Sequence, residues 1–177
     1  MQDWDGGIFG VDLIGNLYRI NATTAVSSLV AHLFDFSPDG HINPTLAGDG
    51  KNLYFTYGAS SIAATPHAST LYRINPNSGV ATTIGITGVE QDGFTDFQGT
   101  GFINGSLYGF TGSIADDGTV GPGNTYRLNL STGAATLVGP YNAEGRVIFG
   151  AIDTPEPTSF SMIALGALAL GLIRRGK

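Results

Sequence analysis

A short motif returns at a constant interval along this chain of 177 residues. LYRIN occupies Leu17–Asn21 and Leu71–Asn75, and the related TYRLN occupies Thr125–Asn129, so both intervals are 54 residues. The second and third copies continue alike, as NPNSGVATTIG and NLSTGAATLVG, whereas the first continues more loosely as NATTAVSSLVAHL. A fixed period of this size indicates a repeat architecture, in which every unit is one supersecondary module.

The third unit can be divided into strands and turns. GTGFI and SLYGFTG flank Asn104-Gly105, a dipeptide that supplies the two positive-φ residues of a two-residue type I′ hairpin turn. NTYRLN predicts the next strand, STG predicts a turn in which Gly133 adopts positive φ, and AATLVG predicts a fourth strand. The third unit therefore predicts four antiparallel strands.

The second unit follows the same order. PTLAG, a turn near Asp49-Gly50, LYFTYG, TLYRIN, the turn NPNSG and VATTIG succeed one another. The first unit begins at GIFGVD, which corresponds to a second strand, and VIFGAID at residues 147–153 nearly copies it. Four antiparallel strands in roughly 50 residues are the layout of a β-propeller blade.

LYRINPNSGVATTIG resembles the L-Y-x-I-(D/N)-x-x-(T/S)-G-x-x-T-x-(I/V)-G repeat of bacterial surface propellers, and the likeness covers most of residues 7–153. The resemblance implies a fold and no activity. We expect residues 1–153 to be all-β, a propeller-like array of about three four-stranded antiparallel blades. Four blades are the usual minimum for a closed ring, so a truncated propeller, an open three-blade fan and assembly with another copy all remain open.

The last 24 residues have a different character. Thr154-Pro155-Glu156-Pro157 breaks regular structure, since proline cannot donate to a β-ladder and restricts the residue before it. Phe160–Ile173 contains 14 residues without a charge, and Arg174 and Arg175 follow it. As a helix this run spans roughly 21 Å, which is short for a hydrocarbon core of about 30 Å. We expect a linker at 154–159 and a marginal transmembrane helix with a basic tail at 160–177, in which Arg174 and Arg175 stop transfer.

The order Pro-Glu-Pro, apolar helix, Arg-Arg resembles the PEP-CTERM sorting signal of Gram-negative bacteria. The resemblance implies export, recognition by an exosortase in the inner membrane, and cleavage near Pro155, Glu156 and Pro157. It also implies residence in the inner membrane as a precursor, then at the cell surface or in an extracellular matrix, with extracellular polysaccharide as a possible partner. The opening MQDWDGGIFG lacks the basic and apolar regions of a secretory signal peptide, so we expect a truncated start or an export signal upstream.

Charge and composition exclude several other functions. Residues 1–154 carry five Lys or Arg against thirteen Asp or Glu, and this acidic body argues against a nucleic-acid partner. The absence of cysteine excludes disulfides and thiolate metal sites. His32, His41 and His67 lack zinc-site spacing, and the chain contains no G-x-S-x-G, G-x-G-x-x-G or Walker loop. We therefore expect no catalytic residue, no metal and no cofactor.

Three sets of residues have two interpretations each. Arg19, Arg73 and Arg127 recur at one repeat position and form either a ring for anions or structural contacts between blades, which we favour. The acidic residues of the predicted loops either bind calcium or, as we favour, are solvated turn residues. They are Asp35, Asp39, Asp92, Asp96, Asp116 and Asp117. Aromatic residues stack on sugars or fill the space between blades; they are Trp4, Tyr54, Tyr57, Phe94, Phe97, Tyr108 and Phe110.

These observations favour a non-catalytic surface or biofilm-matrix protein. The alternatives are a carbohydrate-binding or enzymatic propeller, and a membrane protein that keeps its tail anchor.

Overall fold

A computed structural model describes residues 7–12, 14–35, 40–41, 45–57, 60–61, 69–89, 97–112 and 123–141. Within these ranges the chain is all-β and contains no helix. Its strands are β1 (Gly7–Val11), β2 (Asn16–Asn21), β3 (Ser27–His32), β4 (Gly40–His41), β5 (Thr45–Gly48), β6 (Leu53–Tyr57), β7 (Ser60–Ser61), β8 (Thr70–Ile74), β9 (Ala81–Ile86), β10 (Phe97–Ile103), β11 (Ser106–Thr111), β12 (Gly123–Leu128) and β13 (Ala135–Tyr141).

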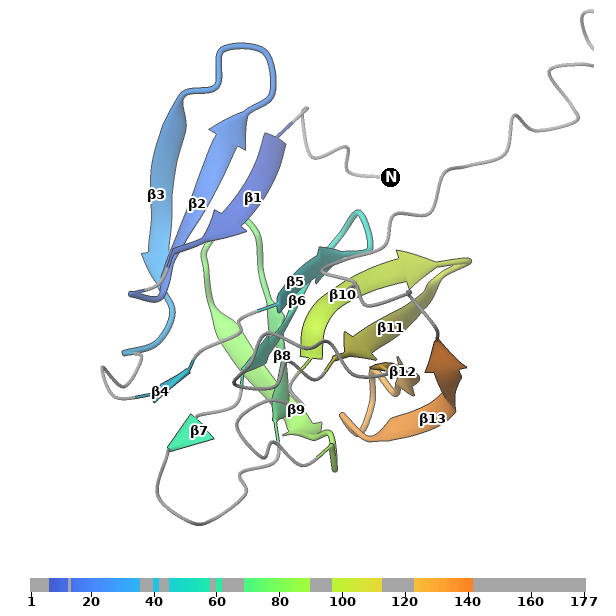
Figure 1. The fold of residues 1–177 in the computed structure, drawn as a ribbon. Helices are drawn as coiled ribbons and strands as arrows, with labels where there is room; N and C mark the ends of the chain where they lie inside the picture. The colour runs from blue at the N-terminus through green and yellow to red at the C-terminus, as the bar shows by residue number, and fades with distance from the viewer. Residues whose placement is uncertain are drawn as a thin grey trace, which may run out of the picture.

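The strands form three main antiparallel sheets in chain order (Figure 1). The first sheet has the order β1-β2-β3, the central sheet β5-β6-β8-β9 and the third sheet β10-β11-β12-β13, while β4 and β7 form a separate pair. β2, β8 and β12 carry the repeated motif and take the same place in each sheet, next to the last strand, as the 54-residue spacing predicts. The first sheet differs from the four-stranded expectation because its described residues contain no counterpart of β5 and β10.

Two predicted turns are present. Ile103 pairs with Ser106, and Asn104 and Gly105 between them have φ angles of 49° and 71°, which confirms the two-residue hairpin. The turn after β5 is longer than a dipeptide, because Gly48 pairs with Leu53. Its start is fixed by Asp49, whose Oδ1 accepts hydrogen bonds from the backbone N–H groups of Lys51 at 2.8 Å and Asn52 at 2.6 Å.

The loop that follows each repeated motif has one structure in all three copies. It begins with an asparagine whose Oδ1 accepts hydrogen bonds from the backbone N–H groups two and three residues later: Asn21, Asn75 and Asn129. The residue four positions after each asparagine donates its N–H to the asparagine carbonyl at 2.8 Å and has positive φ: Ala25 at 56°, Gly79 at 68° and Gly133 at 82°. Asparagine suits this position because its short side chain mimics a backbone turn.

Each last strand contains a β-bulge at the same repeat position. In the first sheet Leu17 pairs with Ala31 and Tyr18 with Leu29, so Val30 is the extra residue. By the same shift in pairing, Ile84 is the extra residue of the bulge in β9 and Val138 is the extra residue of the bulge in β13. A bulge raises the local twist of the strand that carries it. The last strand of each sheet is therefore bulged, and locally twisted, at the same repeat position.

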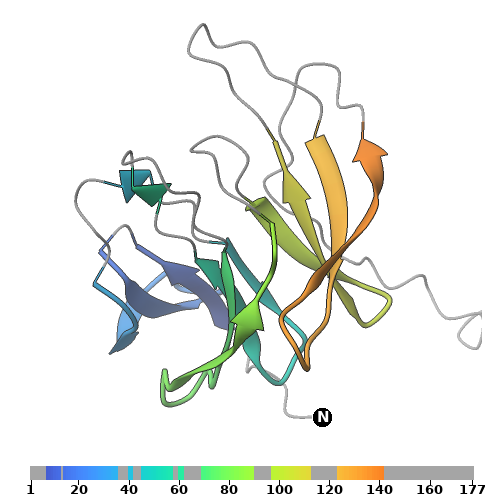
Figure 2. The same cartoon turned by 90° about the horizontal axis from the view of Figure 1, so that it is seen from below.

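The central sheet lies between the first and third sheets (Figure 2) and packs against an apolar cluster on each face. One face packs against the first sheet around a cluster in which every member is at most 2% exposed: Leu17, Leu53, Phe55 and Ile74. The other face packs against the third sheet around Tyr54, Leu71, Val89, Phe97, Leu107 and Leu128. The three sheets therefore lie side by side, with one apolar layer between each neighbouring pair.

The loop of each later sheet also contacts the bulged strand of the sheet before it. A Cβ built on Gly79 would lie 2.1 Å from Ala31 Cβ, and one built on Gly133 would lie 2.5 Å from the carbonyl oxygen of Gly85. Gly79 and Gly133 are one repeat apart, as are Ala31 and Gly85. Because this approach leaves no room for two side chains, each observed contact has glycine on at least one side.

Candidate functional site

The residues that carry the sorting-signal resemblance lie outside the described part of the chain. These are Pro155, Glu156 and Pro157 of the expected cleavage motif and Arg174 and Arg175 of the expected stop-transfer segment. The expected C-terminal helix at 160–177 lies there too. A search of the described ranges for an apolar helix long enough to cross a membrane finds none.

The three repeated arginines lie on successive sheets and do not converge. Each arginine pairs across strands with an aromatic residue on one neighbouring strand and with a serine or threonine on the other. The triplets are Phe9–Arg19–Ser28, Tyr54–Arg73–Thr82 and Tyr108–Arg127–Thr136. Each arginine shares a face with the residue two positions before it, and Leu17 and Leu71 place that face toward the next sheet. One sheet therefore separates each arginine from the next.

Most of the described aromatic candidates fill the layers between sheets. Tyr54 and Phe97 belong to the cluster between the central and third sheets, and Tyr57 packs against the cluster on the opposite face. Phe110 is 7% exposed, and Tyr108 is half-buried. Trp4 and Phe94 lie outside the described residues. The space-filling interpretation therefore holds for Tyr54, Tyr57 and Phe97.

His32 has polar partners on both ring nitrogens. Nδ1 lies 2.9 Å from Asn16 Oδ1, and Nε2 lies 3.0 Å from Asp35 Oδ1. Asn16 is itself oriented by Asp12, whose Oδ2 accepts a 3.0 Å hydrogen bond from Asn16 Nδ2. A general base in nucleophilic catalysis would direct one nitrogen at a hydroxyl, whereas these nitrogens are directed at an amide and a carboxylate. The group ties β2, β3 and the start of the next loop together.

Asp12 and Asp49 accept backbone hydrogen bonds within turns. Burial acts to raise the pKa of Asp49, but hydrogen bonds from the backbone N–H groups of Asn52 and Lys51 outweigh it and lower the pKa overall. The Tyr54 hydroxyl donates to Asp49 Oδ2 at 3.2 Å, and burial together with this carboxylate raises the tyrosine pKa. The described residues contain no group of three or more His, Asp or Glu placed to hold a metal ion. Asp39, Asp92, Asp96, Asp116 and Asp117 lie outside them.

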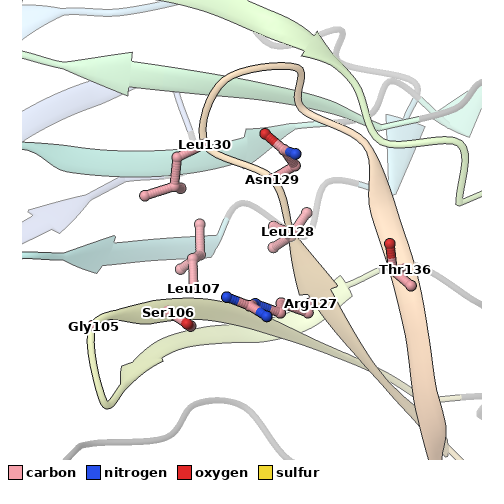
Figure 3. A pocket seen from close by; sticks show the side chains of 8 residues that line it. All are labelled: Gly105, Ser106, Leu107, Arg127, Leu128, Asn129, Leu130 and Thr136. Atoms are coloured by element: carbon pink, nitrogen blue, oxygen red, sulfur yellow. The ribbon is translucent and has the colours of Figure 1, made fainter.

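One pocket of about 420 Å³ opens at an end of the third sheet. It lies between the Asn104-Gly105 turn and the loop after β12, and is lined by Gly105, Ser106, Leu107, Arg127, Leu128, Asn129, Leu130 and Thr136. Figure 3 shows the Arg127 side chain extending from β12 toward Ser106 and Leu107 of β11. Arg127 is the one charged residue among the eight, so the pocket combines a cation, two hydroxyls and three leucines. Sequence reasoning selected Arg127 but not the pocket, which depends on how two turns meet.

Comparison of the chain with known protein families and with curated proteins finds no match.

Proposed function

We propose that the chain is an exported, non-catalytic surface or biofilm-matrix protein with a propeller-like ectodomain and a PEP-CTERM sorting tail. An exosortase in the inner membrane cuts the tail near Pro155–Pro157 and releases the ectodomain to the cell surface or the extracellular matrix. The observation that carries the proposal is the order of three parts in the last 24 residues: Pro-Glu-Pro, an uncharged apolar run and Arg-Arg.

The physical properties of the tail suit a temporary anchor. A run of 14 residues falls about 9 Å short of the hydrocarbon thickness, so it holds the chain in the bilayer only marginally. Arg174 and Arg175 add attraction to the anionic cytoplasmic leaflet, worth about 1 kcal/mol each. The precursor therefore stays in the membrane long enough to be cut. Removal of the apolar tail is also a step in the processing of other anchor signals.

The ectodomain suits display rather than catalysis. Three sheets of one pattern, each with an equivalent asparagine-capped loop between its last two strands and an equivalent bulge, support a propeller-like array. The described polar clusters, such as the Asp12–Asn16–His32–Asp35 group, tie strands and turns to one another. Such a body supplies a stable, acidic surface outside the cell.

The test is mass spectrometry of the C-terminus in surface and membrane fractions of a host with a working exosortase. Residues 158–177 should be absent from mature surface protein. Replacing Pro155, Glu156 and Pro157 by alanine should leave the precursor in the membrane fraction, whereas replacing Arg174 and Arg175 by glutamine should weaken retention before cutting. An intact Lys177 on mature surface protein would refute the sorting proposal and favour a permanent tail anchor.

The pocket favours a second candidate, a lectin-like site for an acidic saccharide. Its one cation, Arg127, can pair with a sugar carboxylate, and the hydroxyl groups of Ser106 and Thr136 can hydrogen-bond to sugar hydroxyls. A glycan array with the wild-type chain and with Arg127→Gln tests it, and Arg73→Gln is the matched control on the central sheet. Binding of uronic-acid glycans that Arg127→Gln alone abolishes supports the lectin. Equal signals from all three proteins exclude this pocket as the site.

A further inference from the structure

The first sheet exposes apolar residues at positions that the other two sheets bury. Ile8 pairs with Ile20 across β1 and β2. The pairs at the same place in the other sheets are at most 3% exposed, because the preceding sheet covers them: Leu53–Ile74 and Leu107–Leu128. Ile8 is 56% exposed, and its partner Ile20 is half-buried. This face, which we call the leading face, has the apolar chemistry of a sheet-to-sheet contact, and none of the described sheets packs on it.

The opposite face of the third sheet shows the complementary feature. The bulge residues Val30 and Ile84 pack against the apolar layer between their own sheet and the next one. Val138 occupies the same repeat position on β13 and is 60% exposed. We call this face, the one that would receive a following sheet, the trailing face. Both ends of the array therefore expose residue positions that are covered inside it.

The glycine contact between loop and bulged strand supplies a second, independent match. Inside the array the contacts are Gly79 on Ala31 and Gly133 on Gly85. One repeat earlier the loop residue is Ala25, and one repeat later the strand residue is Gly139. A Cβ built on Gly139 meets nothing within 4 Å, so the space above it is open. Ala25 against Gly139 has one side chain and one glycine, the same combination as Gly79 against Ala31.

One position on the trailing face departs from the repeat. Thr125 stands where Leu17 and Leu71 are fully buried. Its cross-strand partner is Phe110, and the corresponding pairs are Val11–Leu17 and Thr56–Leu71. The larger apolar side chain has therefore moved to the neighbouring strand, where Phe110 is 7% exposed. The open positions of the trailing face are Val138 and Gly139 on β13.

We propose that the leading face of one copy of this chain packs on the trailing face of a second copy, with the same geometry that joins successive sheets within one copy. The contact is heterologous, because two different surfaces meet, and such contacts either close into a ring or continue as a filament. The number of copies rests on the propeller architecture of the proposed function. Propellers close with four to eight blades, and with the three main sheets that the described residues of each copy form, only two copies satisfy that range. The assembly is thus a ring of two chains and six sheets.

The test uses the full chain, purified in a mild non-ionic detergent because residues 160–173 are apolar, and native mass spectrometry across a dilution series. Ile8→Asp places a charge on the leading face and Val138→Asp places one on the trailing face. Ile86→Asp is the matched control, since Ile86 is 65% exposed on the last strand of the central sheet and lies on neither end face. All three sites are more than half exposed, so circular dichroism should show unchanged folding.

We expect the wild type and the control Ile86→Asp to form the same dimer. For each end-face variant the dissociation constant of the dimer should rise by more than about tenfold, because the contact would bury an unpaired charge. The decisive arm mixes the two end-face variants, one of them isotope-labelled. Each carries one intact face of the opposite kind, so the mixture should form a mixed dimer through a single contact, although neither variant pairs with itself.

Four results would overturn the proposal. The first is a monomeric wild type, because the two faces would then not pair between copies. The second is loss of association in one end-face variant only, because pairing of like faces would spare the other. The third is a mixture that fails to pair. The fourth is association insensitive to both substitutions, which would place the contact in the apolar tail. None of these results depends on processing of the tail, so the sorting proposal stands or fails separately.

Discussion

Three equivalent loop residues have the left-handed conformation, and only one of them carries a side chain. Gly79 and Gly133 adopt positive φ without steric cost, whereas Ala25 does so at φ 56°. A left-handed alanine costs roughly 1–2 kcal/mol. The asparagine cap and the hydrogen bonds of the loop hold Ala25 in place.

Ala25→Gly should therefore stabilise the protein. Relief of the strain outweighs the extra chain entropy that glycine adds to the unfolded state, and the net gain should be about 0.5–1 kcal/mol by urea unfolding. Ala22→Gly in the same loop is the control, because Ala22 does not have positive φ, and it should destabilise slightly. Equal effects at the two positions would contradict this account.

Asp49 makes stability depend on acidity. The pKa of its carboxyl in the folded chain is below the ordinary 3.8, because backbone hydrogen bonds outweigh the effect of burial. A lowered pKa contributes stability that is present above pH 3.8 and is lost as the pH falls through the folded value. The carboxylate form therefore supports the turn at neutral pH.

Asp49→Asn keeps an acceptor oxygen for the turn but cannot ionise. The variant should be less stable than wild type at pH 7, and the difference should shrink below pH 3.8 as the wild-type carboxyl is protonated. Urea denaturation at several pH values measures both. A gap that stays constant from neutral to acidic pH would show that the charge has no role.

At the scale of elements, the asparagine-capped loops act as spacers between sheets. Gly133 contributes a backbone shape and also permits the close approach to Gly85. Gly50 contributes only the shape, since its φ is 85° and an added Cβ would meet nothing within 4 Å. Substitution of Gly50 therefore tests conformational strain alone, whereas substitution of Gly133 tests strain together with packing between sheets.

Gly50→Ala should cost about 1 kcal/mol, the strain of a left-handed alanine. Gly133→Ala should cost that amount plus roughly 1–3 kcal/mol, because its Cβ displaces the backbone of the neighbouring sheet. Thermal and urea unfolding of both variants gives the difference. If Gly133→Ala proved no worse than Gly50→Ala, the loop would not fix the spacing of the sheets.

The elements that sequence predicts best are those that depend on local chemistry. The constant spacing predicted β2, β8 and β12, and Asn104-Gly105 predicted its hairpin, because periodicity and positive φ are written in neighbouring residues. The bulges at Val30, Ile84 and Val138 were not predicted, since a bulge is a matter of register between strands. The pocket beside Arg127 was missed for a related reason, because two turns distant in sequence create it.

At the scale of the whole molecule, a repeat position has a different environment at each place in the array. Ile74 in the central sheet is fully buried, whereas Ile20 at the same position in the first sheet is half-buried. In a stacked array, stability is a sum of unit terms and contacts between neighbours, so identical substitutions should have unequal costs. The difference in cost between the two substitutions therefore reports whether the leading face is covered in solution.

Ile74→Ala should cost about 2–5 kcal/mol at every protein concentration, because the cavity lies inside one chain. Ile20→Ala should cost less in dilute solution, where its side chain is partly in water. Its cost should rise with concentration, because the proposed second copy buries Ile20 and binding adds stability by mass action. Melting temperatures of both variants and of wild type across a hundredfold concentration range provide the comparison. A cost for Ile20→Ala that does not change with concentration would mean that nothing intermolecular covers the leading face.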